Sequence, residues 1–174
     1  MFMRHLVAIA VLPFVVAVAV PIGLARSNGV RLAPGTVLLG VVAQTAGVLL
    51  VMMGLWLFVS SLQRFAVDGK GTLAPWDPPR RLVVSGPYRF VRNPMISGVV
   101  FVLFGEGLVL LSRAQLLWAL TFFLVNCIYI PLLEEPMLAA CFGEAYHEYR
   151  RHVPRLIPRI QPWNPATPPT DRSG

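Results

Sequence analysis

The sequence predicts an all-α membrane protein, a polytopic bundle of four transmembrane helices with a C-terminal amphipathic helix at the cytoplasmic surface. Two observations lead to this fold class. The 174-residue chain has a mean hydropathy of +0.66 and only 13% charged residues, roughly half the share of a soluble domain. Its apolar residues gather in four runs near the ~20 residues that cross a bilayer as a helix. These runs are residues 6–24, 35–62, 95–111 and 114–133.

The first run, residues 6–24, is predicted to be a membrane span because it is longer than a usual signal sequence and three further apolar runs follow it. The second run carries small residues that give it a face for close packing: Gly40, Ala43, Gly47 and Gly54. Small residues let helix backbones approach closely in lipid, where burial of apolar surface does not drive association. We therefore expect the second helix to pack tightly against a neighbour.

The third and fourth runs are separated only by Ser112 and Arg113. So short a turn predicts a tight antiparallel helical hairpin. The start of the third helix and the end of the fourth then lie at the same side of the membrane. Asn93-Pro94 and Glu134-Glu135 are therefore predicted to be neighbours.

The distribution of positive charge predicts the topology. With both termini on one side, that side holds 12 of the 15 Lys and Arg residues, including those of the loop 64–92. The positive-inside rule then predicts a multi-pass protein of the cytoplasmic membrane with both termini in the cytoplasm. Topology and anionic lipid headgroups account for the net charge of +7, so no nucleic-acid partner is predicted. The two cysteines predict neither a disulfide framework nor a metal site.

The remaining segments flank this hairpin. The loop 63–92 is rich in Gly and Pro and is predicted to be mostly non-helical. Pro136 suits the first turn of a helix, and apolar residues at three- and four-residue spacing predict an amphipathic cytoplasmic helix over 136–151. Four prolines among small polar residues predict a disordered tail over 160–174. Residues 1–159 would form a single domain.

Three polar groups should converge at the cytoplasmic end of the bundle: the loop 80–93, the pair Glu134-Glu135, and Tyr146 with Tyr149. Carboxylates can bind an ammonium or a ribose, aromatic rings can stack on a base, and backbone amides can bind its edge. The mixture suits a cationic or zwitterionic ligand that contains adenine. Each group also has a structural interpretation: acidic residues stabilise a helix N-terminus, and tyrosines and arginines anchor a protein at the membrane interface.

Glu106 lies near the middle of the third run. A carboxylate at the centre of a bilayer costs about 2.5–3.5 kcal/mol on insertion scales, so it is usually functional or paired. Glu106 is a candidate catalytic residue, as a proton acceptor for an amine or a hydroxyl group. The alternative is a polar clamp between helices, with Gln44 or Asn126 as partner.

An ordered series of motifs resembles the superfamily of isoprenylcysteine carboxyl methyltransferases and phospholipid methyltransferases, in its bacterial branch. The series covers about residues 69–159, more than half of the chain. It comprises Leu82-Val83, Ser85-Gly86, Tyr88, Arg92-Asn93-Pro94, Gly98, Gly105, Glu134-Glu135, Phe142-Gly143-Glu144, Tyr146, Tyr149, Val153-Pro154 and Pro158.

The resemblance implies an integral membrane enzyme that transfers a methyl group from S-adenosylmethionine to a lipid or another lipophilic acceptor. It implies a cytoplasmic cofactor site in the C-terminal half and direct in-line transfer, helped by positioning and by exclusion of water. Glu134 would be a catalytic residue as well as a cofactor contact. The implied cofactor-binding residues are Arg81, Leu82, Val83, Tyr88, Arg92, Asn93, Glu134, Glu135, Tyr146 and Tyr149.

The chain departs from the family pattern at two positions. Asn93 replaces the usual histidine, and an amide cannot act as a general base near neutral pH. Ile130 replaces an arginine that serves the carboxylate substrate of the eukaryotic prenylcysteine enzymes, which argues against a prenylcysteine acceptor. Two alternatives remain: a non-catalytic membrane assembly module that retains the fold, and an NADPH-dependent membrane reductase. The sequence specifies neither the acceptor nor an oligomeric state.

Overall fold

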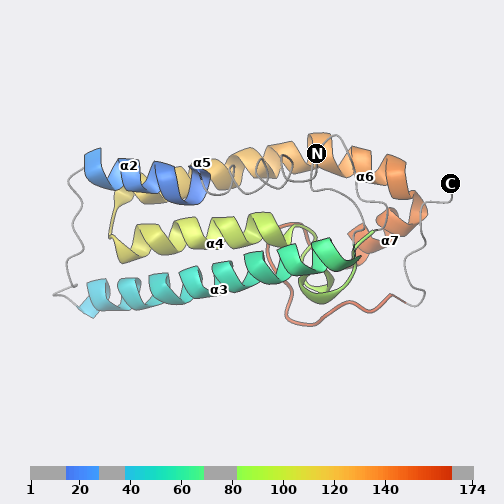
Figure 1. The fold of residues 1–174 in the computed structure, drawn as a ribbon, viewed down its shortest axis with the longest axis horizontal. Coiled ribbons are helices and arrows are strands. Elements are labelled where there is room, and N and C mark those ends of the chain that lie inside the picture. Colours follow the sequence, from blue (N-terminus) through green and yellow to red (C-terminus); the bar gives the residue numbers. More distant parts are fainter. Residues whose placement is uncertain (1–14, 28–37, 69–81, 166–174) are drawn as a thin grey trace.

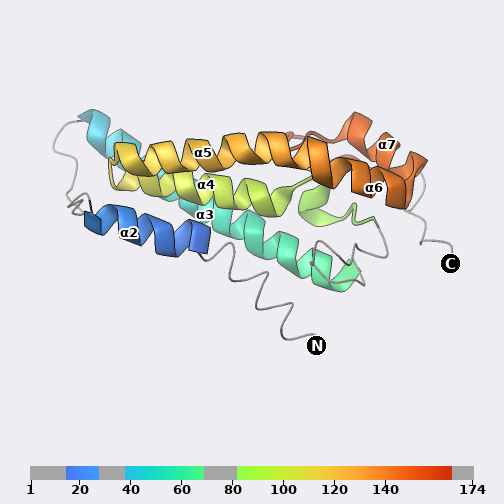
Figure 2. The same ribbon diagram turned by 90° about the horizontal axis from the view of Figure 1, so that it is seen from above.

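The computed structural model describes residues 15–27, 38–68 and 82–165. In these residues all regular structure is helical, which confirms the all-α class for this part of the chain. The long helices run side by side, with α4 between α3 and α5 and with α2 beside α5 (Figure 1, Figure 2). The elements are η1 Val15–Ala19, α2 Val20–Ser27, α3 Leu38–Asp68, η2 Gly86–Arg89, α4 Pro94–Val109, α5 Arg113–Tyr129, η3 Ile130–Glu134, α6 Glu135–Phe142 and α7 Glu144–His152.

Two helical stretches, Leu38–Arg64 and Arg113–Phe142, are long and apolar enough to cross a membrane. Val15–Ser27 and Pro94–Val109 are shorter apolar helices, so the arrangement of four spans stays a prediction. Both long stretches turn large apolar side chains outward, among them Leu49, Trp56 and Ile128, which are more than 60% exposed. Surfaces of this kind suit contact with lipid.

The contact between α3 and α4 is built on two pairs of glycines. A Cβ atom at Gly47 would lie 2.7 Å from the Gly105 carbonyl oxygen, and one at Gly54 would lie 2.6 Å from the Gly98 oxygen. The two glycines on each helix are seven residues apart, so the pairs lie two turns apart along one antiparallel interface. The predicted small-residue face of the second helix is confirmed at Gly47 and Gly54.

A proline explains how the N-terminal helix is attached to α5. In a π-helical turn, a carbonyl oxygen accepts from the N–H group five residues later, which for Val16 is position 21. Pro21 has no N–H group, so it cannot supply this hydrogen bond. The Trp118 indole N–H donates to that oxygen at 3.1 Å, and Gln115 donates its side-chain amide to the Pro21 oxygen at 2.7 Å. Donors from a neighbouring helix are how freed backbone groups are satisfied in lipid.

The predicted hairpin of α4 and α5 is confirmed. α4 ends at Val109, α5 begins at Arg113, and the Ser112 hydroxyl accepts a hydrogen bond from the backbone N–H of the third residue after it. Gly107 keeps the two helices close, because a Cβ atom there would lie 2.6 Å from a Leu116 methyl carbon. The start of α4 and the C-terminal continuation of α5 therefore lie at the same end of the molecule (Figure 1).

The prediction that the fourth helix ends at residue 133 is wrong. A π-helical turn at Ile130–Glu134 and then α6 carry it on to Phe142. The wider turn accommodates Pro131, which cannot donate to the preceding turn. The predicted single helix over 136–151 is also wrong, since Gly143 adopts a φ of 55°, which favours glycine, and separates α6 from α7.

The predicted disordered tail over 160–174 is wrong for its first residues. Residues 160–165 are described, and Trp163 packs against the cluster that contains Tyr146 and Tyr149. Packing of a large aromatic side chain outweighs the bias of the neighbouring prolines against regular structure. Residues 166–174 lie outside the described residues.

Candidate functional site

The loop that enters α4 is held by the chain that follows α7. The Arg92 backbone N–H donates to the Pro154 oxygen at 2.8 Å, and the Asn93 N–H donates to the Arg155 oxygen at 3.1 Å. These contacts join residues about sixty positions apart in sequence. They fix the backbone of the two residues that precede Pro94.

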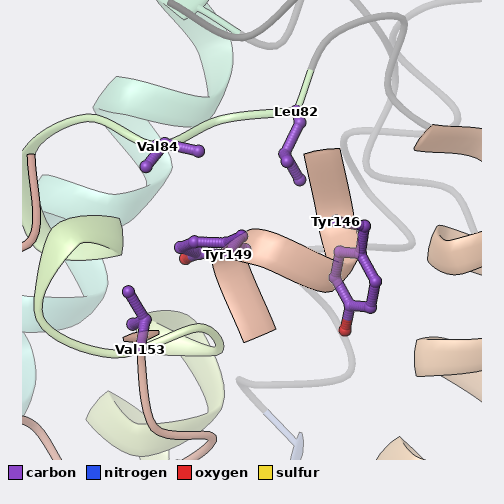
Figure 3. Close-up of a cluster of buried hydrophobic side chains, with 5 residues drawn as sticks. All are labelled: Leu82, Val84, Tyr146, Tyr149 and Val153. Atoms are coloured by element: carbon purple, nitrogen blue, oxygen red, sulfur yellow. The ribbon is translucent and has the colours of Figure 1, made fainter. Parts of the chain in front are cut away.

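A buried cluster beside this loop contains both predicted tyrosines. The Tyr149 hydroxyl donates to the Tyr88 carbonyl oxygen at 2.6 Å, which ties α7 to η2. Tyr146 and Tyr149 are each 2% exposed, and burial raises the pKa of both phenols, so they stay neutral. Figure 3 shows Tyr149 between apolar side chains of the loop and of the chain after α7. The cluster consists of Leu82, Val84, Tyr146, Tyr149 and Val153.

Three arginines surround the carboxylate of Glu135, which is 2% exposed. Its Oε1 atom accepts from Arg155 Nε at 2.6 Å and lies 2.9 Å from Arg92 Nη1, while Arg150 lies 3.6 Å from Oε2. A buried carboxylate needs such partners to offset its loss of hydration. The Glu135 bond in turn raises the pKa of Arg155. The predicted proximity of the loop to the acidic pair is confirmed by the Arg92 contact.

Glu134 has different surroundings from its neighbour. It is half-buried, and its side chain makes no hydrogen bond or ion pair with any residue that the structure describes. The pKa of Tyr88 is raised mainly by burial and further by the charge of Glu134, which places these two groups within electrostatic reach. Asn93 precedes α4 without using its side chain as a cap. Glu134, Tyr88 and Asn93 thus bring polar groups to the same end of the bundle.

Arg92 has one donor that no described residue accepts. Its Nη1 atom contacts Glu135 and lies 3.4 Å from the Tyr146 hydroxyl oxygen. Its Nε atom is buried and has no hydrogen-bond partner in the described part of the chain. An unsatisfied buried donor costs about 1–3 kcal/mol, and an acceptor atom of a bound molecule would remove that cost.

The structure separates Glu106 from this cluster. Glu106 follows Pro94 by twelve residues in α4, which corresponds to about 18 Å along the helix. Its Oε2 atom is buried without a hydrogen-bond partner among the described residues. Of the two predicted clamp partners, Gln44 donates to the Val109 backbone oxygen at 3.1 Å, and Asn126 donates to a carbonyl of its own helix.

Among the other predicted residues, Leu82 belongs to the buried cluster, Val83 next to it is also buried, and Arg81 lies outside the described residues. The sequence argument missed Arg155 and Trp163. The Trp163 N–H donates to the Arg89 oxygen at 2.9 Å, and Arg89 Nε donates to the Trp163 oxygen at 3.0 Å. In the sequence, the one feature that could have indicated this contact is an aromatic residue, Trp163, in a segment rich in proline.

Comparison with known proteins gives two matches. The sequence pattern of the phospholipid methyltransferase family matches residues 42–145, which include α4, α5 and the acidic pair. Methanethiol S-methyltransferase 2 of Bradyrhizobium diazoefficiens is 36% identical over 76 residues, which make up 42% of this chain and 27% of the relative. The chain thus spans about a quarter of the length of that relative. No solved structure matches the chain.

Proposed function

The chain belongs to the phospholipid methyltransferase family, and from this premise we propose that it transfers a methyl group from S-adenosylmethionine to a lipophilic acceptor in the membrane. The observation that carries the proposal is the half-buried carboxylate of Glu134, which has no partner among the described residues, beside Tyr88 and the fixed Arg92–Glu135 pair. The excess of Lys and Arg at this end supports a cytoplasmic site and cytoplasmic termini in a four-span topology.

The unused groups at this end fit the parts of the proposed donor. S-adenosylmethionine, when bound, supplies a methyl group on a positively charged sulfur. Glu134 offers a carboxylate to a cationic group, and Asn93 offers an amide to a ribose or an adenine edge. The unpaired Nε atom of Arg92 suits the carboxylate of the amino-acid end. Leu82 and Val83, with Arg81 before them, would lie along the adenosine end.

The remaining residues would hold these contacts in place. Glu135 is enclosed by arginines, so its role is to orient Arg92. Tyr146 and Tyr149 are buried and neutral, and they would support the wall of the site. With such preorganised contacts, the protein contributes orientation of the reactants and exclusion of water.

The acceptor class follows from the absence of a histidine at position 93. Asn93 cannot take a proton near neutral pH, and Glu106 lies about 18 Å along α4 from Pro94, so it does not replace a base at position 93. An acceptor that ionises without a strong base suits this site best. Methanethiol, which the relative's name gives as its substrate, is a small apolar thiol, and thiols lose their proton far more readily than alcohols do.

Neither alternative function gains support from the matches. A reductase would need cations for the 2′-phosphate of NADPH, which Arg80, Arg81 or Arg150 would have to supply. Of these three, Arg150 lies in the described residues. Arg150 is directed towards Glu135 at 3.6 Å. A non-catalytic module would retain the fold but would not require a half-buried carboxylate that has no partner among the residues described, as Glu134 does.

Binding of S-adenosylhomocysteine, the product of the donor, tests the proposal by titration calorimetry on the full chain in detergent. Glu134→Gln keeps the shape and removes the charge, so we expect binding roughly tenfold weaker or more. Glu148→Gln is the matched control, because Glu148 is exposed on α7. No saturable binding by the unmodified protein, or equal binding by Glu134→Gln, would contradict the proposal. Stabilisation by NADPH instead would favour the reductase.

A further inference from the structure

The chain that follows α7 crosses the loop that precedes α4, and we name residues 153–163 the C-terminal strap. Pro154 and Arg155 of the strap contact Arg92 and Asn93 at the end of the loop, whereas Arg159 and Trp163 contact Phe90 and Arg89 nearer its start. Ser97 of α4 adds a bond from its hydroxyl to the Leu156 oxygen at 2.7 Å. The four backbone bonds are Arg92 N–H to Pro154, Asn93 N–H to Arg155, Arg159 N–H to Phe90 and Trp163 N–H to Arg89, at 2.8–3.1 Å.

Trp163 anchors the far end of the strap. Its ring stacks on His152 with centroids 5.1 Å apart and lies 5.8 Å from the ring of Tyr149. Its backbone accepts from Arg89 Nε and donates to the Arg89 oxygen. Because Tyr149 also holds the Tyr88 carbonyl, one aromatic cluster fixes both residues at the end of η2.

Arg155 anchors the near end of the strap by two different groups. Its side chain donates to Glu135 at 2.6 Å, and its carbonyl oxygen accepts from the Asn93 backbone. A single strap residue thus sets the position of Asn93 and the orientation of the carboxylate that holds Arg92. The two anchors together reach the loop at Tyr88, at Arg89 and at Asn93.

We propose that the C-terminal strap is a positioning element of the methyl-donor site, with Trp163 and Arg155 as its positioning residues. The proposal rests on the proposed function, because it names what holds the same side chains in place. The strap need not touch the donor. Its contribution is to fix the backbone between Tyr88 and Asn93, since small displacements of a site reduce affinity and rate strongly.

The test at the far anchor compares Trp163→Ala and Trp163→Phe with Ile160→Ala, a control on the same strap whose side chain is 96% exposed. Affinity for S-adenosylhomocysteine is measured in detergent below the unfolding temperature of every variant. We expect Trp163→Ala to bind about tenfold more weakly, Trp163→Phe to recover most of the loss, and Ile160→Ala to match the unmodified protein.

Hydrogen exchange without ligand gives a second, independent measurement. The Arg92 and Asn93 amides donate hydrogen bonds to carbonyl oxygens of the strap. Trp163→Ala should speed hydrogen exchange of these two amides, while Ile160→Ala should leave them protected. At the near anchor, Arg155→Lys should lose less affinity than Arg155→Ala. Arg151→Ala is the control there, because Arg151 is exposed and its ion pair is with the exposed Glu144.

The outcomes separate the two proposals. If the unmodified protein binds S-adenosylhomocysteine and folded Trp163→Ala and Arg155→Ala bind it equally well, the strap proposal is overturned and the proposed function stands. If the unmodified protein does not bind it, both are overturned. Should Trp163→Ala fail to fold, the near anchor decides through Arg155→Lys and Arg155→Ala, and unchanged affinity in both overturns the proposal.

Discussion

The two ends of α4 are held in different ways. At its first residue, Pro94, the helix follows a loop fixed by ion pairs and by hydrogen bonds from the C-terminal strap. Near its other end, Gly105 lies against the backbone of Gly47, and the neighbouring Glu106 has a buried oxygen atom without a partner in the described residues. One end is fixed by directional contacts with distant segments, the other by close approach of two backbones.

The difference indicates which end does chemistry. Directional contacts hold side chains in one orientation. Within the described part of the chain, they leave Glu134 and one donor of Arg92 without a partner at the loop end. Close backbone packing fixes the distance between helices but orients no polar group. The loop end is therefore equipped to bind a ligand, and the glycine end maintains the bundle.

The largest expected effect comes from Glu135→Ala, which removes the buried carboxylate shared by Arg92 and Arg155. Loss of one partner of a buried pair costs about 3–5 kcal/mol, so we expect a large fall in unfolding temperature and loss of S-adenosylhomocysteine binding. Thermal unfolding in detergent measures the first and calorimetry the second. Glu144→Ala, at a side chain 76% exposed, should change neither. Equal stability of both variants would show that the ion pairs of Glu135 do not stabilise the loop end.

A smaller effect is expected at the glycine end from Gly105→Ala. The new Cβ would lie 2.6 Å from the Gly47 carbonyl oxygen, so the helices must separate, at a cost of about 1–3 kcal/mol. Gly23→Ala is the matched control, because nothing lies within 4 Å of a Cβ there. The unfolding temperature should fall for Gly105→Ala and not for Gly23→Ala. A fall in both would mean that helix glycines matter for another reason than this contact.

The sequence predicted the glycine end better than the loop end. The interface at Gly47 and Gly54 depends on residue size and spacing along one helix, and the hairpin depends on a two-residue turn. Both are local features, and both are confirmed. The break at Gly143 was hidden because apolar residues keep helical spacing on both sides of it.

The contrast between Glu134 and Glu135 could not be predicted from helical periodicity. The π-helical turn that ends at Glu134 widens the helix and shifts which face each following residue occupies. The strap escaped prediction because its contacts join residues far apart in sequence, such as Arg89 and Trp163. No local pattern encodes such pairs. The convergence of the loop with Glu134-Glu135 followed from the short turn between two helices, while the individual cofactor contacts came from resemblance to a family.

The smallest effect is expected from Glu106→Gln, which keeps the shape of the side chain and removes its acidic group. Glu106 lies about 18 Å along α4 from Pro94, and sites this far apart act independently. Affinity for S-adenosylhomocysteine should therefore stay within about twofold of the unmodified protein, in contrast to Glu134→Gln. Loss of binding in Glu106→Gln would show that the two ends of α4 act as one site. Unchanged binding with loss of methyl transfer would instead place the acceptor along α4, between the loop end and the glycine end.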